Sequence, residues 1–158
     1  MSENYERVDM TGRDAGENLN EEHVYTLAIL APGIISSIFV FIPIENYLSA
    51  YIVPSTFIWY RLWRAALIAL LLWIVSGFIY SEKRYSWKMF FLGSAVTFMV
   101  FHYWFLWSIN MVIPVRLYPL FYFVGDNSPY VLDMGQVVGL ITLYAFRGEI
   151  LGSLKNRR

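Results

Sequence analysis

His102 has the most distinctive position of any polar residue, because it lies near the centre of a long uncharged run. That run, residues 89–113, contains no Asp, Glu, Lys or Arg. An imidazole in an apolar segment needs a hydrogen-bond partner, and such groups can bind haem or carry protons. The second histidine, His23, lies just before another apolar run, which argues against a bis-histidine haem site. We therefore expect His102 to be a neutral, hydrogen-bonded structural histidine.

Arg61 and Arg64 are three residues apart, which places them on one face of a helix beside Trp59 and Trp63. Arginine next to tryptophan is typical of an anchor at the membrane interface. A sharper alternative is a lipid-binding site at these four residues, in which arginine clamps the phosphate of an anionic lipid such as cardiolipin. Three acidic residues are expected on the same side and could pair with the arginines instead: Glu45, Asp126 and Asp133.

Gly135 and Gly139 form a small-xxx-small motif, which lets two membrane helices approach closely. Gln136 lies beside the first glycine and could donate a hydrogen bond across that contact. We therefore predict a helix-packing site at these three residues. Two weaker versions of the motif lie in the second and third apolar segments: Ala65 with Ala69, and Gly93 with Thr97.

No residue pattern in the sequence predicts a catalytic or metal site. The chain has no cysteine, which excludes zinc thiolate sites and thiol nucleophiles. Phosphate-loop, dinucleotide-binding, zinc-protease and serine-hydrolase motifs are absent from the sequence. The aromatic block 101–107 could cradle a pigment or a quinone, but aromatic side chains in membrane spans more often pack between helices or face lipid. We expect no enzyme activity, no metal and no cofactor other than a bound phospholipid.

The elements that carry these residues are expected to be membrane-spanning helices. Apolar residues make up 58% of the 158-residue chain and charged residues 15%, against about 25% charged residues in soluble domains. We predict an all-α integral membrane protein with four transmembrane helices, over residues 24–44, 57–80, 89–113 and 130–146. The first and third are long enough to cross about 30 Å of hydrocarbon without a charge. The last can span only if Asp133 lies at the head-group level.

The remaining segments are predicted to lie outside the membrane core. Residues 115–124 are apolar and aromatic but too short to cross, so we expect an interfacial segment between the third and fourth helices. The predicted domains are an acidic tail (1–23), a four-helix transmembrane domain (24–146) and a basic tail (147–158). In this topology nine of the 12 Lys and Arg residues lie on the side of the two tails. The positive-inside rule then places both termini in the cytoplasm or matrix.

These features favour a non-catalytic accessory subunit of a multi-subunit membrane complex. An acidic tail of this length needs more docking surface than four helices offer, and small cysteine-free subunits are frequent in respiratory and other energy-transducing assemblies. The expected location is the mitochondrial inner membrane or a prokaryotic plasma membrane, with other subunits and anionic lipids as partners and no nucleic acid. Two alternatives are a small homo-oligomeric transporter or channel, and a cofactor-binding membrane protein centred on His102.

Overall fold

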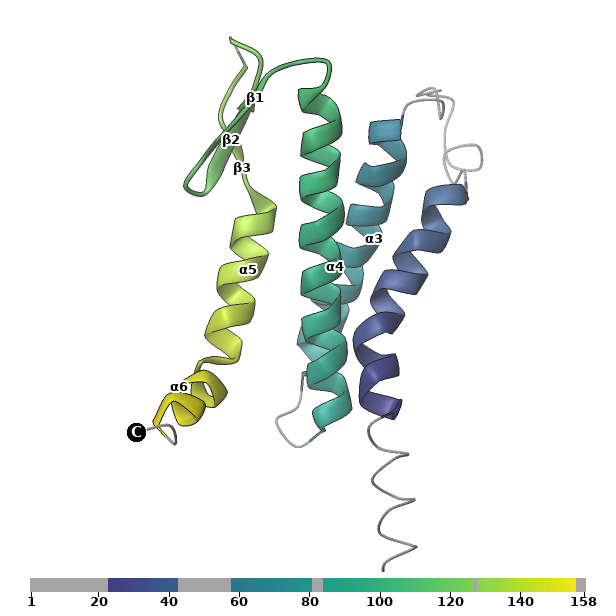
Figure 1. The fold of residues 1–158 in the computed structure, drawn as a ribbon, viewed down its shortest axis with the longest axis vertical. Helices are drawn as coiled ribbons and strands as arrows, with labels where there is room; N and C mark the ends of the chain where they lie inside the picture. The colour runs from purple at the N-terminus through teal and green to yellow at the C-terminus, as the bar shows by residue number, and fades with distance from the viewer. Residues whose placement is uncertain (1–22, 43–57, 81–83, 127, 156–158) are drawn as a thin grey trace, which may run out of the picture.

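Three long antiparallel helices form the main body of the structure, a computed structural model that describes residues 23–42, 58–80, 84–126 and 128–155 (Figure 1). They are the first helix His23–Phe41, α3 (Ile58–Ile79) and α4 (Tyr85–Asn110). Each is long and apolar enough to cross a membrane. The prediction of long apolar helices is therefore confirmed for three of the four, and they are compatible with an integral membrane protein. The predicted acidic tail lies outside the described residues, apart from His23.

The pairing of α3 with α4 follows from the spacing of their buried residues. The buried apolar residues of α3 recur at helical intervals, and most of them are alanines: Leu62, Ala65, Ala66 and Ala69. The facing positions of α4 recur every three or four residues: Phe91, Ala95, Phe98, His102 and Leu106. Small residues on one helix let the rings of the other enter the contact, which is how helices associate in a membrane.

The first helix meets α4 through a close backbone contact. A β-carbon added to Gly93 of α4 would lie 2.2 Å from the carbonyl oxygen of Ile29. One turn further along, a β-carbon on Gly33 would lie 3.5 Å from Oγ1 of Thr97. Glycine is therefore required at position 93, because any other side chain would push the two helices apart.

The fourth predicted span is not confirmed, because its helix is shorter than expected. Helix α5 runs from Met134 to Ala145, which is 12 residues or about 18 Å of helix. Residues 130–133 precede it as extended chain and a helix cap. The helix packs beside α4 (Figure 1), and its Val138 joins the core formed by alanines of α3 and Phe98 of α4. Helix α6 (Arg147–Lys155) follows at the same end of the bundle as His23.

Residues 115–124, predicted as an interfacial segment, form a β-hairpin, so the all-α expectation is wrong for this segment, while its position at the interface stays a prediction. Strands β1 (Val115–Tyr118), β2 (Phe121–Val124) and β3 (Val131–Leu132) make an antiparallel sheet in the order β1-β2-β3. The two-residue loop is Pro119-Leu120, and Leu120 has a φ of 65°. Proline followed by a positive φ is typical of a type II turn, although glycine is the usual second residue. The protein is therefore mostly helical with one small sheet.

Candidate functional site

A buried carboxylate, Asp133, lies at the junction between β3 and α5. Its side chain is fully buried and caps α5, accepting hydrogen bonds to Oδ1 from the backbone N–H groups of Gly135 (2.9 Å) and Gln136 (3.3 Å). The first turn of a helix has backbone donors without intrahelical partners, so an aspartate at this position satisfies them. Oδ2 of the same carboxylate accepts from Nε2 of Gln136 at 2.9 Å.

His102 is the partner of Asp133 on α4. Its Nε2 lies 3.0 Å from Oδ1 of Asp133, and the hydroxyl of Tyr103 donates to Oδ2 at 3.2 Å. Gly135 makes this approach possible, because a β-carbon there would lie 2.8 Å from Cδ2 of His102. The hydrogen-bond partner that the sequence required for His102 is therefore Asp133. Asp133 was also predicted to lie with the arginines; instead, it pairs with His102, and no ion pair between Asp133 and an arginine is found in the described part of the chain.

Gln136 connects this cluster to the hairpin. Its Nε2 also donates to the carbonyl oxygen of Tyr118 at 3.0 Å, and its Oε1 accepts from the backbone N–H of Leu120 at 2.8 Å. The backbone N–H of Asp133 donates to the carbonyl oxygen of Leu120 at 2.8 Å. One glutamine side chain thus fixes the turn of the hairpin against the first turn of α5.

The small-xxx-small motif of Gly135 and Gly139 packs against another helix of the same chain. A β-carbon on Gly139 would lie 3.3 Å from Sδ of Met99 on α4, so Gly135 and Gly139 both face α4. The predicted helix-packing residues therefore lie between α5 and α4, and Gln136 reaches the hairpin rather than a neighbouring helix.

The predicted lipid-binding residues on α3 differ in their surroundings. Arg64 is only 5% exposed, and its Nη2 donates to the carbonyl oxygen of Val40 on the first helix at 2.9 Å. Arg61 is exposed, and Trp63 is 42% exposed. Trp59 packs edge-on against Tyr60. The structure therefore gives Arg64 a role in holding the first helix against α3, while Arg61 faces outward.

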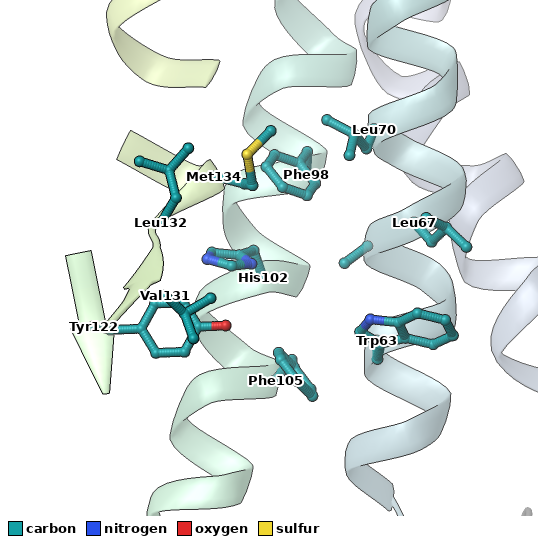
Figure 2. A pocket seen from close by; sticks show the side chains of 11 residues that line it. Trp63, Leu67, Leu70, Phe98, His102, Phe105, Tyr122, Val131, Leu132 and Met134 are labelled. Atoms are coloured by element: carbon teal, nitrogen blue, oxygen red, sulfur yellow. The ribbon is translucent and has the colours of Figure 1, made fainter. Parts of the chain in front are cut away.

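A cavity of about 180 Å³ adjoins His102 (Figure 2). Five elements line it (α3, α4, β2, β3 and α5), and the lining is mostly apolar: Trp63, Ala66, Leu67, Leu70, Phe98, Phe105, Val131, Leu132 and Met134, with His102 and Tyr122 as the ionisable members. Burial and, to a smaller extent, the charge of Asp133 raise the pKa of Tyr122. Its phenol therefore stays protonated at neutral pH and can donate a hydrogen bond.

The cluster provides one hydrogen-bonding position that the chain itself does not use. A carboxylate accepts from the Nε2–H of His102, so the other ring nitrogen, Nδ1, carries the lone pair of the neutral imidazole. Among the described residues, Nδ1 has no hydrogen-bond partner. The histidine can therefore accept a hydrogen bond from a bound group, and its orientation is fixed by Asp133. No group of three His, Asp or Glu side chains in the described ranges could hold a metal ion.

The sequence analysis did not identify Tyr103 as a hydrogen-bond partner of Asp133 or Tyr122 as part of the cavity lining. It also did not identify the role of Asp133 as a helix cap. A signal for Asp133 was present. An aspartate followed three residues later by Gln136, at the start of an apolar run, is typical of a capped helix N-terminus. The tyrosines carried no such signal, because their contacts depend on how the hairpin and α5 fold back onto α4.

Comparisons of the chain with protein-family models, with curated proteins and with solved structures find no match.

Proposed function

We propose that this chain is a non-catalytic accessory subunit of a multi-subunit membrane complex, to which it contributes helix packing and lipid contacts. The observation that carries the proposal is a groove along the outer face of the first helix. Its volume is about 490 Å³, and its lining residues all belong to that helix: Leu30, Gly33, Ile34, Ser37, Ile38 and Phe41. The groove is thus a shallow concave strip on a single helix.

The groove has the chemistry of a helix-docking surface. Ser37 is a small, exposed residue of the groove, and Gly33, whose β-carbon position faces Thr97 of α4, lies at its edge one turn earlier. Lipid chains gain little from such a strip, whereas a partner helix can bring its backbone close and gain dispersion contacts. The first helix also has the smallest buried share inside the chain, 11% against 33% for α3 and 39% for α4. A partner helix would give it neighbours in addition to those that the described residues supply.

Two further features support an energy-transducing assembly, such as a respiratory-chain complex, and its lipids. The His102–Asp133 pair is an ionisable pair within the helical bundle, and such pairs occur where membrane proteins handle protons or polar ligands. Arg61 is exposed next to Trp59 and Trp63, which supports contact with an anionic lipid such as cardiolipin. The proposed location is a mitochondrial inner or prokaryotic plasma membrane, with both termini on the matrix or cytoplasmic side.

The test is native electrophoresis of the gently solubilised, affinity-tagged chain, with mass spectrometry of the polypeptides that migrate with it. Ser37→Phe fills the groove, whereas Val100→Phe adds the same ring at an exposed position of α4 and serves as the matched control. We expect the wild-type and Val100→Phe chains to migrate in a large species containing other polypeptides. The Ser37→Phe chain should be released from it.

Two results would contradict the proposal. The first is migration of the wild-type chain alone. The second is a species that contains only copies of this chain, which would favour the homo-oligomeric alternative. Equal retention of Ser37→Phe and Val100→Phe in the large species would show that the partner does not use the groove.

A further inference from the structure

The cavity beside His102 has the size of one six-membered ring. Its volume is about 180 Å³, and an apolar protein cavity of about 150 Å³ is known to bind benzene. Ala66 is the small residue in the α3 wall, and the α4 wall contributes Phe98 and Phe105 at either side of His102 (Figure 2). Aromatic walls of this kind favour a planar ring, which can stack on one face and meet the others edge-on.

The polar groups of the cavity come from two neighbouring elements, His102 from α4 and Tyr122 from β2 (Figure 2). Figure 2 shows the Tyr122 ring reaching from β2 toward α4, with its hydroxyl oxygen on the side of His102. The two ring centroids are 6.3 Å apart. His102 supplies a hydrogen-bond acceptor at Nδ1, and Tyr122 supplies a donor. A ring with two hydroxyls could satisfy both, since one hydroxyl donates to Nδ1 and the oxygen of the other accepts from the phenol.

The mouth of the cavity is formed by apolar side chains on the outside of the bundle. Four lining residues are between 39% and 44% exposed on the outside of the bundle: Trp63, Leu67, Val131 and Leu132. His102 lies eight residues before the end of α4 at Asn110, which is about 12 Å along the helix axis. An apolar molecule dissolved in the bilayer is therefore suited to enter the cavity from this side.

We propose that this cavity binds the ring of a prenylated quinol. The quinol hydroxyl donates to Nδ1 of His102, the ring lies between the aromatic walls, and the tail leaves through the mouth beside Leu67. A phospholipid head group fits less well, because no Lys or Arg of the described residues lines the cavity. An acyl chain would leave the histidine without a partner. The inference goes beyond the proposed subunit role and does not depend on a partner helix.

The test measures binding of decylubiquinone and its quinol to the full-length chain in phosphatidylcholine nanodiscs. The nanodiscs are captured, and the quinone is extracted and quantified by absorbance, with protein-free nanodiscs subtracted. Leu67→Trp places an indole in the mouth, and Leu71→Trp places the same group one turn away on the exposed face of α3. Leu71 does not line the cavity, so it provides the matched control. Circular dichroism and thermal unfolding verify that both variants fold.

We expect saturable binding at about one quinol per chain and weaker binding of decylubiquinone, whose carbonyl oxygens cannot donate to Nδ1. Leu67→Trp should weaken quinol binding roughly ten-fold or more, which corresponds to the loss of one well-buried group, and Leu71→Trp should leave it unchanged. Tyr122→Phe removes one neutral hydrogen bond and should weaken binding about five-fold; it also provides a test if Leu67→Trp fails to fold. Uptake no greater than in protein-free nanodiscs would overturn the proposal. So would equal affinities of the two tryptophan variants, or an unchanged affinity of Tyr122→Phe.

Discussion

Replacing Gly93 by alanine should separate the first helix from α4. The new β-carbon would lie 2.2 Å from the carbonyl oxygen of Ile29 and 2.9 Å from its carbonyl carbon. Close carbon–oxygen contacts in proteins are about 3.3 Å, so the backbones must move apart by roughly 1 Å. The obstacle is main chain, which cannot turn away as a side chain can. That displacement also opens the neighbouring contact between Gly33 and Thr97.

The balance of two opposing effects sets the expected magnitude. Overpacking of a tight contact costs about 1–3 kcal/mol, whereas alanine gains up to about 1 kcal/mol over glycine as a helix former. We therefore expect Gly93→Ala to destabilise the protein by up to about 2 kcal/mol. Gly148→Ala in α6 is the control, because a β-carbon there meets nothing within 4 Å. The control should be neutral or slightly stabilising.

Two measurements test this reasoning. Thermal unfolding in detergent, followed by circular dichroism, gives the relative stability of the two variants. Because the chain has no cysteine, cysteines introduced at Gly33 and Thr97 form a unique pair, whose rate of disulfide formation reports the distance between the helices. We expect a lower midpoint and slower disulfide formation in Gly93→Ala. If this variant matches Gly148→Ala in both measurements, the close backbone contact between the first helix and α4 is refuted.

Three further predictions concern the cluster, the hairpin and the topology. Asp133→Ala leaves several buried donors without a partner, and each unsatisfied donor costs about 1–3 kcal/mol. This variant should therefore unfold at a lower temperature than Asp133→Asn, which retains an acceptor oxygen. Equal unfolding midpoints would contradict the assigned contacts. Leu120→Gly removes a left-handed strain of roughly 1 kcal/mol and should leave the unfolding midpoint unchanged or raise it, so a clear fall would argue against the turn. Asp126 and Glu149 are both exposed. Cysteines introduced at these two positions should react with a membrane-impermeant reagent from opposite sides of the membrane. Labelling of both from the same side would refute the topology.

The three long helices could be predicted from the sequence because their signal is contained in continuous apolar runs. The predicted ranges 24–44, 57–80 and 89–113 correspond to His23–Phe41, Ile58–Ile79 and Tyr85–Asn110. Burial in lipid depends on composition over about 20 residues, which a single sequence displays directly.

The hairpin and the start of α5 could not be predicted in the same way, although a helix was expected within residues 130–146. Residues 115–124 are apolar on both faces, so they lack the alternation that identifies a half-buried strand. Their pairing is fixed by the turn at Leu120 and by the hydrogen bonds of Gln136, which become visible only in three dimensions. Asp133 was read as a charge that must stay near water. In the structure it is buried, because α5, His102 and Tyr103 together supply its hydrogen-bond donors.

The shortness of α5 has a consequence for biosynthesis. An apolar segment of 12 residues is too short for the insertion machinery to release into the bilayer as an independent span. Its capping carboxylate can leave water only when donors from α4 are available, since unsatisfied polar groups are costly in hydrocarbon. Helix α4 must therefore be inserted first, and α5 then folds against it after its own synthesis. Truncation after α4 should leave the earlier helices inserted, whereas α5 expressed without α4 should stay outside the membrane.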